Sequence, residues 1–394
     1  NSTLQLNHFL KTSPSLRRLE MRGTEPDTNE EQLKETMKAS IVFESISRSN
    51  LLVKLTLCNI LLGDDCPLEG FLSSTRTLLE FYYFQSYSTM THQAAQAIGS
   101  GLAQNKTLVK LHWYVNEGVD FLEEVVFGLC DHISLKTLEL KIKLTKSSSL
   151  ALRSLLHCNR TLERFDLTHL KDQEKIPTMA SVLAGLAQNT GLKTFSFESY
   201  STETNATFPT LATAWTNMLQ KNTSIRILDF RKTELEIEAD CSFCSAFAEG
   251  LVANSTLETL YLPGWSRAEV FQGPVWQEML KSNHWLKKLY LSHSGVSLEA
   301  FECLARGLSH NTSLEYLDLG GTSMVDADVV ALTKGLRKNK TLKCLDLSDN
   351  CALSQSGRAA IERMIGYNVL RELMLANTEE SVGASISTSG LSYN

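Results

Sequence analysis

The sequence predicts an α/β solenoid in which short parallel strands alternate with helices. The motif L-x-x-L-x-L, or a close variant, recurs along nearly the whole chain at intervals of 26 to 36 residues. Most intervals hold a stretch with the apolar spacing of a helix. Gly and Asn also recur at fixed distances before the motif. A strand–helix unit of this size cannot bury its apolar face alone, so we expect the units to stack.

Thirteen motif starts define the units of this array, which we predict to form a single domain over residues 1–378. The starts are Leu16, Leu52, Leu78, Leu108, Leu135, Leu162, Leu192, Ile225, Leu257, Leu286, Leu314, Leu342 and Leu370. Residues 379–394 are rich in Ser, and we expect a disordered tail there. Because the chain begins without an initiator Met, we expect a fragment of a longer protein.

Each unit is predicted to hold one strand and one helix. The L-x-L part of the motif alternates with period 2, which predicts a short strand with Leu pointing inward. In the stretch "DADVVALTKGLRKN", Val329, Leu332 and Leu336 lie on one helical face. Strands that follow one another in the same direction through helices predict a parallel sheet with right-handed crossovers.

Two further columns accompany the helix. Seven residues before the start, Gly is predicted to allow close approach to the neighbouring unit, and it occurs at 101, 128, 185, 250, 307 and 335. Three residues before the start, Asn is predicted to end the helix by adopting the left-handed conformation. It occurs at 105, 159, 189, 222, 254, 283, 311 and 339.

The Asn column also explains most N-glycosylation sequons. Sequons occur at Asn1, Asn105, Asn159, Asn205, Asn222, Asn254, Asn311 and Asn339. Six of the eight lie in the Asn column, where the repeat itself requires Asn and then Thr or Ser. We therefore expect the sequons to be by-products of the repeat, without glycans.

Composition excludes several classes of function. The net charge of −6 and the pI near 5.9 argue against a nucleic-acid partner, and no apolar run is long enough for a membrane helix. Nine cysteines without framework spacing predict free thiols in the cytoplasm. Cys241 and Cys244 form a lone CxxC, which by itself is weak support for a zinc or redox site.

The segment "LKCLDLSDN" at 342–350 fits the pattern L-x-x-L-x-L-x-x-N and resembles the leucine-rich repeat family. Its repeat length near 28 residues resembles the ribonuclease-inhibitor-like class. The phrase "GLRKNKTLKCLDL" is similar to the repeat arrays of NOD-like receptors. The resemblance implies a horseshoe with a concave parallel sheet and convex helices, which binds other proteins through its concave face.

In such a horseshoe the non-Leu positions of each strand point into the concavity, and they gather two aromatic clusters. The first is predicted from Tyr82, Phe84, His112 and Tyr114. The second is predicted from Tyr261, Tyr290 and Tyr316, flanked by Asp229, Arg231, Asp318 and Asp346. Tyrosines beside charges are typical of interface hot spots. The alternative is that aromatic residues simply have high strand propensity and pack across strands.

Loops near the second cluster offer a further hint. Residues 198–210 and 231–245 lengthen two units, and residues 263–276 bring Pro, Gly and two Trp. All three leave the same end of adjacent strands, and loops on a rigid scaffold commonly carry recognition. Inert insertions are the alternative.

The sequence thus predicts a non-enzymatic module that binds a protein partner through the concave face and the 198–276 loops. A narrower version of this hypothesis makes it the recognition array of a larger receptor or signalling protein. No catalytic motif, cofactor site or metal site is found. We expect a monomer or one part of a multidomain chain, with no nucleic acid or membrane as partner. Two alternatives remain: an inhibitor of a basic enzyme through an acidic concave face, and a passive scaffold.

Overall fold

The structure, a computed structural model, describes residues 15–23, 51–60, 62–64, 66–86, 90–115, 121–169, 178–199, 208–231, 241–262, 274–365, 370–375 and 385–387. The chain divides into two compact units, Asn1–Lys193 (unit 1) and Thr194–Asn394 (unit 2). Each unit is described by itself.

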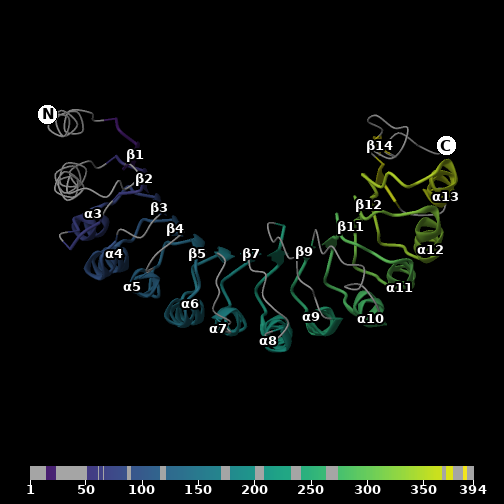
Figure 1. Cartoon of the computed structure of the whole chain (residues 1–394), viewed down its shortest axis with the longest axis horizontal. Helices are drawn as coiled ribbons and strands as arrows, with labels where there is room; N and C mark the ends of the chain where they lie inside the picture. Colours follow the sequence, from purple (N-terminus) through teal and green to yellow (C-terminus); the bar gives the residue numbers. More distant parts are fainter. Residues whose placement is uncertain are drawn as a thin grey trace. The chain divides into compact units, whose positions relative to one another are not determined.

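In the described part of unit 1, parallel strands follow the order of the chain, and helices lie on one side of them (Figure 1). The strands are β1 (Arg18–Arg22), β2 (Lys54–Cys58), β3 (Glu80–Gln85), β4 (Lys110–Val115), β5 (Thr137–Ile142) and β6 (Arg164–His169). The helices are α3 (Leu68–Ser74), α4 (His92–Gln104), α5 (Leu122–Phe127), α6 (Lys146–Cys158) and α7 (Thr178–Leu186).

Unit 2 repeats this arrangement in its described residues. Its parallel strands are β7 (Thr194–Ser199), β8 (Ile227–Asp229), β9 (Thr259–Tyr261), β10 (Lys288–Tyr290), β11 (Tyr316–Asp318), β12 (Cys344–Asp346) and β13 (Glu372–Met374). Its helices are α8 (Phe208–Lys221), α9 (Cys241–Ala253), α10 (Pro274–Ser282), α11 (Leu298–Leu308), α12 (Asp326–Leu336) and α13 (Gln355–Ile365).

The strands follow the sequence motif. Each of β1 to β13 begins two residues after a predicted motif start, from Arg18 after Leu16 to Glu372 after Leu370. Alternate residues are buried, as in β3, where Phe81 and Tyr83 are inaccessible and Tyr82 is half-buried. The core therefore lies between the strands and the helices, and one face of each sheet points away from the helices. We call this second face the open sheet face.

The helix prediction is confirmed at α12. Val329, Leu332 and Leu336 are buried together on the face of α12 that packs toward the core. The neighbouring helices α11 and α12 pack against each other, as do the other successive helix pairs within each unit. Helix packing therefore supplies the stacking that a single repeat lacks.

The Gly column has the predicted role of close approach. A Cβ atom at Gly335 would lie 2.0 Å from the carbonyl oxygen of Ala305 on the neighbouring helix. We expect Gly335→Ala to lower the free energy of unfolding by about 2 kcal/mol, since the backbone must move apart. Gly70→Ala is the matched control, because a Cβ there meets nothing within 4 Å and should be neutral or slightly stabilising. Urea unfolding of both variants checks the pair, and equal effects would contradict the packing role.

The prediction that the Asn column adopts the left-handed conformation is wrong. Asn105 and Asn159 are extended, with φ of −72°, and the non-Gly residues with positive φ in the described chain lie outside the column. Each Asn instead accepts, on Oδ1, the backbone N–H of the motif Leu or Ile three residues later. Most donate Nδ2 to a carbonyl at the end of the preceding repeat's helix. The column is a buried line of hydrogen bonds that ties each repeat to its neighbour.

This arrangement bears on the sequons. The column asparagines are at most 5% exposed, and the Nδ2 atom that a glycan would occupy is buried in hydrogen bonds. The sequon hydroxyls are also used, as where Thr107 Oγ1 donates to the Leu78 carbonyl at 3.0 Å. In the folded repeats these sequons are therefore structural. The sequons at Asn1 and Asn205 lie outside the described residues.

Three residues of the tail, which the sequence predicts to be disordered, form a strand in the structure. Ser385–Ser387 form β14, which pairs antiparallel with β13 through Leu373 and Ile386. The open edge of β13 is thus covered by the chain itself, which removes a row of unpaired backbone groups. The rest of the tail lies outside the described residues.

Candidate functional site

The open sheet face of unit 2 carries a row of three stacked tyrosines, which we call the tyrosine ladder. Tyr261 and Tyr290 are Cα partners on β9 and β10, and their ring centroids lie 4.1 Å apart at 21°. Tyr316 begins β11, and its ring lies 4.7 Å from that of Tyr290. All three are half-buried. The structure therefore brings together the three rings that the sequence columns predict to be neighbours.

Arg231 completes one end of the tyrosine ladder. Its guanidinium carbon lies 4.1 Å from the centroid of the Tyr261 ring, a cation–π contact. Arg231 also donates to both carboxylate oxygens of Asp229, at 2.7 Å from Nη2 and 3.1 Å from Nε. Asp229 is the Cα partner of Tyr261. The Arg231 guanidinium, the Tyr261 ring and the Asp229 carboxylate therefore contact one another where β8 and β9 end.

Two carboxylates lie at the other end of the tyrosine ladder. Asp318 is the Cα partner of Tyr290 on one side and of Asp346 on the other. The side chain of Asp318 accepts the Gly320 N–H at 2.8 Å, and that of Asp346 accepts the Ser348 N–H at 2.9 Å. Burial, and less strongly the charge of Asp346, raises the pKa of Asp318, partly offset by the Gly320 hydrogen bond. Neither carboxylate is ion-paired with a described Lys or Arg.

The hydroxyls of Tyr290 and Tyr316 stay protonated far above neutral pH. Burial, followed by a hydrogen bond with Tyr261, raises the pKa of Tyr290 to about 12. Burial and the neighbouring Asp318 raise the pKa of Tyr316 further. The tyrosine ladder therefore offers apolar rings with hydroxyl groups at their tips, beside two carboxylates that no described Lys or Arg pairs with.

Unit 1 carries the other predicted cluster, which we call the N-terminal aromatic cluster: Tyr82, Phe84, His112 and Tyr114. Tyr82 stacks on His112 with centroids 4.0 Å apart at 6°, and Phe84 meets Tyr114 edge-on at 4.6 Å. Lys54 places its Nζ 3.8 Å from the Tyr82 centroid on the other strand neighbour. Both sides of Tyr82 therefore have neighbours, which favours cross-strand packing at this ring.

Glu139 organises this cluster, and the sequence interpretation did not select it. Its carboxylate lies 2.6 Å from His112 Nδ1 and also accepts the Tyr114 hydroxyl. Burial and this hydrogen bond raise the pKa of Tyr114 well above its usual range. The signal was present, because Glu139 follows His112 in the same sequence column and is its Cα partner. These contacts engage His112 Nδ1 and the Tyr114 hydroxyl within the protein, whereas the buried His112 Nε2 has no hydrogen-bond partner among the described residues.

A groove of about 740 Å³ lies beside the cluster on the open sheet face of unit 1. Tyr82, Phe84 and Tyr114 line it together with Arg22, Lys54, Lys141 and Glu20, among others. Arg22 is bonded to Glu20 at 2.5 Å, and Lys54 lies 3.8 Å from Glu80. The groove therefore mixes both signs of charge and selects no ligand class by charge alone.

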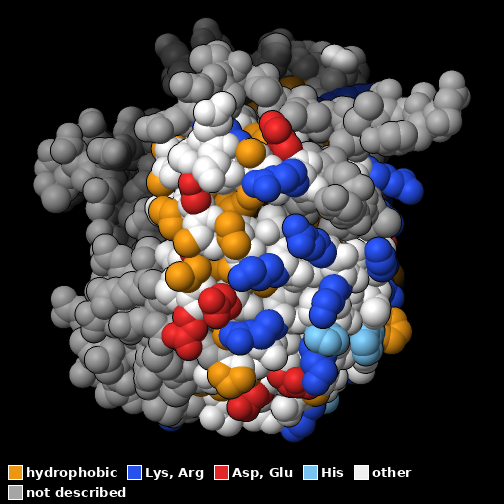
Figure 2. All heavy atoms as spheres, turned by 90° about the vertical axis from the view of Figure 1, so that its right-hand side faces the viewer, with side chains coloured by type: hydrophobic (Ala, Val, Ile, Leu, Met, Phe, Trp, Pro, Cys, Tyr) orange, Lys and Arg blue, Asp and Glu red, His pale blue; other side chains and the backbone are white. Residues whose placement is uncertain are grey.

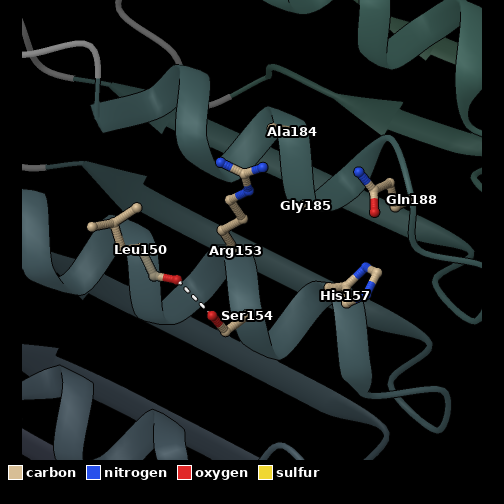
Figure 3. A pocket seen from close by; sticks show the side chains of 7 residues that line it. All are labelled: Leu150, Arg153, Ser154, His157, Ala184, Gly185 and Gln188. Carbon is tan, nitrogen blue, oxygen red and sulfur yellow. Dashed lines mark hydrogen bonds between the residues drawn. The ribbon is translucent and has the colours of Figure 1, made fainter.

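A smaller hollow of about 350 Å³ lies between α6 and α7, on the helix side of unit 1 (Figure 3). Leu150, Arg153, Ser154, His157, Ala184, Gly185 and Gln188 line it. A Cβ atom at Gly185 would lie 3.0 Å from the Arg153 Cα. The hollow follows from the close approach of the two helices at a Gly of the column, and its lining holds no buried charge.

The helix side of unit 2 is basic, in contrast to its open sheet face. Lys and Arg side chains follow one another across the side on which α11, α12 and α13 lie (Figure 2). Among them are Lys334, Arg337, Lys338 and Lys340, all exposed around the end of α12, where the helix dipole favours cations. None of these four is ion-paired with another described residue. An anionic partner would therefore meet the helix side, and a cationic partner the open sheet face.

Several predicted features fall outside the described residues. They include most of the loops at 198–210, 231–245 and 263–276. The side chains of Cys241 and Cys244 are likewise undescribed, while the seven other cysteines are free thiols. Across the described ranges, no group of three His, Cys, Asp or Glu side chains could hold a metal ion. No helix in the part of the chain that the structure describes is long and apolar enough to cross a bilayer.

The repeats match a known family and a known fold. The family model described as Leucine Rich repeat matches residues 338–361, which contain β12 and the start of α13. The solved structure of TLR13 in complex with ssRNA13 has a TM-score of 0.50 at 15% identity, covering 94% of this chain and 45% of that one. The chain has the fold of leucine-rich-repeat solenoids. At this identity the structural likeness shows the fold alone.

Two other leucine-rich-repeat comparisons carry less weight. NACHT, LRR and PYD domains-containing protein 3 from Bos taurus is 30% identical over 138 residues, which cover 34% of this chain and 13% of that protein. This solenoid therefore spans a small part of that relative. The structure of Rad7 with Elc1 from yeast has a TM-score of 0.45 at 13% identity, covering 99% of this chain and 91% of that one.

Proposed function

We propose that this solenoid is a protein-binding module whose contact surface is the open sheet face of unit 2, centred on the tyrosine ladder. The observation that carries the proposal is three stacked, half-exposed tyrosines beside two carboxylates without a cationic partner. Rigid aromatic area with a polar tip is the chemistry that dominates interface energetics. The loops at 198–276 would extend this surface.

The alternative that aromatics merely pack across strands accounts better for the N-terminal aromatic cluster. There His112 Nδ1 and the Tyr114 hydroxyl bond within the protein, through Glu139. We therefore rank Tyr82, His112 and Tyr114 below the tyrosine ladder as contact residues. Because a carboxylate pair repels phosphates, the open sheet face of unit 2 favours a protein partner over nucleic acid, although TLR13 was solved with ssRNA13.

We further propose that the solenoid belongs to the ribonuclease-inhibitor-like class and works in the cytoplasm, as one part of a larger receptor or signalling protein. Spacings of 28 residues between the last motif starts, with a full helix in each repeat, support the class. Free thiols at seven cysteines fit a reducing compartment. No catalytic step is part of the proposal.

An inhibitor of a basic enzyme is the second candidate. The observation that favours it is the acidic character of Asp318 and Asp346 on the same face. Such a complex would form quickly at low ionic strength and weaken steeply with added salt. A passive scaffold would show neither a salt-dependent partner nor an effect of substitutions on this face.

Replacing the tyrosine ladder with serines is expected to abolish partner capture. Affinity capture from native lysate would compare the intact chain with a folded Tyr261→Ser/Tyr290→Ser/Tyr316→Ser variant, and the partner's affinity should fall by about 100-fold or more. The matched control is Lys334→Ser/Lys338→Ser/Lys340→Ser on the helix side of the same unit. The control should retain the partner.

Equal capture by both variants and the intact chain would contradict the proposal and leave the tyrosine ladder as strand packing. Loss of capture only with the helix-side variant would indicate instead an anionic partner that binds the Lys side chains on the helix side of unit 2. Circular dichroism of both variants confirms that each is folded before the capture is compared.

A further inference from the structure

The chain itself shows how this surface holds a guanidinium group. At the β8–β9 end of the tyrosine ladder, Arg231 lies over the Tyr261 ring and donates along its edge to Asp229. The face of the guanidinium meets the π-system while its N–H groups meet the carboxylate. This division of contacts suits the planar fork of Arg, and the point charge of Lys cannot reproduce it.

The same groups recur at the β10–β12 end with twice the negative charge. Tyr290 and Asp318 are Cα partners, as Tyr261 and Asp229 are, and Asp346 adds a second carboxylate one strand further. Tyr316 supplies a second ring. The described chain provides this end with no Arg: Lys288, the Cα partner of Tyr316, makes no ion pair with either Asp.

The two carboxylates converge on one point. A Cβ atom at Gly320 would lie 3.2 Å from Asp318 Oδ1 and 3.9 Å from Asp346 Oδ1. The space above Gly320 is therefore bounded by both oxygens, and Gly at this position leaves it free of a side chain. Each carboxylate is held in direction by a backbone N–H two residues along. Like charges held on neighbouring strands destabilise a sheet unless something compensates them.

We propose that this end of the tyrosine ladder binds an arginine side chain of the partner protein, with its face against Tyr316, the end ring of the row, and its N–H edge donating to Asp318 and Asp346. The site rests on the proposed function and deepens it, because it states the chemistry the partner must present. The partner is a protein with an exposed arginine on a basic surface. Charge complementarity selects it, since three carboxylates (Asp318, Asp346 and Glu372) lie at this end against one Lys and the imidazole of His293.

Ring signals of the tyrosines provide a direct test on the full chain. With ¹³C-labelled Tyr, the tripeptide acetyl-Gly-Arg-Gly-amide should shift the Tyr290 and Tyr316 signals, while the citrulline analogue, of the same shape without the charge, should not. The chain contains ten tyrosines, so the remaining signals serve as internal references. Shifts of equal size with both peptides, or with neither, would overturn the proposal.

Substitutions that remove a negative or a positive charge from this end are expected to change binding in opposite directions. Asp318→Asn and Asp346→Asn should each weaken binding of the arginine peptide by about tenfold, whereas Lys288→Gln should strengthen it by removing a like charge. The matched control is Glu302→Gln, which removes the same charge from an exposed position on α11, on the helix side, and should stay within about twofold. A Lys288→Gln variant that binds more weakly, or a control as weak as Asp346→Asn, would count against the site.

A divalent cation is the competing occupant of two carboxylates. Calcium alone, at millimolar concentration, should leave the Tyr290 and Tyr316 signals unchanged, because Ca²⁺ requires six to eight oxygens. The same shifts with calcium as with the peptide would reassign the site to a metal. If the serine variant of the tyrosine ladder loses the captured protein but Asp318→Asn/Asp346→Asn retains it, the proposed function survives and the arginine site fails.

Discussion

Asn339→Ala is expected to destabilise the solenoid by about 3 to 5 kcal/mol, an effect at the upper end for a single side chain. Asn339 is 1% exposed. Its Oδ1 accepts the N–H groups of Thr341 at 2.9 Å and Leu342 at 2.7 Å. Its Nδ2 donates to the carbonyls of Leu308 at 2.7 Å and Asn311 at 3.2 Å. Alanine would leave two buried donors and the helix-end carbonyls without these partners.

Urea unfolding measures the loss, and amide hydrogen exchange in α11 and β12 locates it, since solenoid repeats contact only their neighbours. The control is Lys340→Ala, one residue along and exposed, which should change stability by less than about 0.5 kcal/mol. Asn339→Asp separates the two halves of the role: it keeps the acceptor but loses both donors and buries a charge, so we expect no rescue. A cost below about 1 kcal/mol for Asn339→Ala would refute a structural Asn column.

The strand positions could be predicted from the sequence because they rest on local periodicity. Leu at alternate positions predicts an inward face wherever it occurs, so each of β1 to β13 begins where the motif places it. The Gly column was equally readable, since close helix approach requires the absent side chain at Gly335. Both inferences need only the residue type that recurs at one position of the repeat, without knowledge of the group it contacts.

The role of the Asn column could not be predicted in the same way. The partners of each Asn amide lie about 30 residues earlier, at the end of another repeat's helix, as with Asn283 and the Leu251 carbonyl. Only the stacked structure brings these groups together. A helix-end Asn in a single repeat is equally consistent with a left-handed residue, which is the interpretation that the structure corrects.

The candidate site could likewise be predicted only in part from the sequence. Sequence columns predict that Tyr261 and Tyr290 are neighbours, because strand register follows from the motif. They do not predict that Arg231 turns back over Tyr261, nor that Glu139 binds two partners in unit 1. Side-chain direction depends on competition among several neighbours, and that competition is settled by the three-dimensional arrangement.

His132 makes stability depend on pH through the same column. It stands three residues before Leu135, the place that Asn takes in the neighbouring repeats, and it is 3% exposed. Its Nδ1 accepts the N–H groups of Ser134 at 3.3 Å and Leu135 at 3.1 Å, as Asn Oδ1 does elsewhere. Burial lowers the pKa of His132 from 6.5 to about 4. Protonation of Nδ1 would also remove the acceptor for both N–H groups.

The sign of the effect follows from the two pKa values. Between pH 6.5 and about 4 the unfolded chain binds a proton on this imidazole while the folded chain does not. The contribution of His132 to the free energy of unfolding should therefore be fully present above pH 6.5. It should be lost as the pH decreases, which lowers the free energy of unfolding by up to roughly 3 kcal/mol near pH 4. Urea unfolding at pH 7, 5.5 and 4.5 measures this loss, which adds to the general titration of carboxylates.

His132→Asn isolates the contribution of this residue. Asn keeps the acceptor for Ser134 and Leu135 and adds a donor directed at the end of α4, as Asn159 does toward Leu129. We expect the variant to be at least as stable as the parent at pH 7 and more stable by about 2 kcal/mol at pH 4.5, because it cannot take up the proton. The control is His157→Asn, an exposed histidine on α6, which should leave the pH dependence of the parent unchanged. Parallel loss of stability by His132→Asn and the parent as the pH falls would contradict this account. It would mean that the buried histidine takes up its proton as readily in the fold as in the unfolded chain, so that the column tolerates a cation where its geometry requires an acceptor.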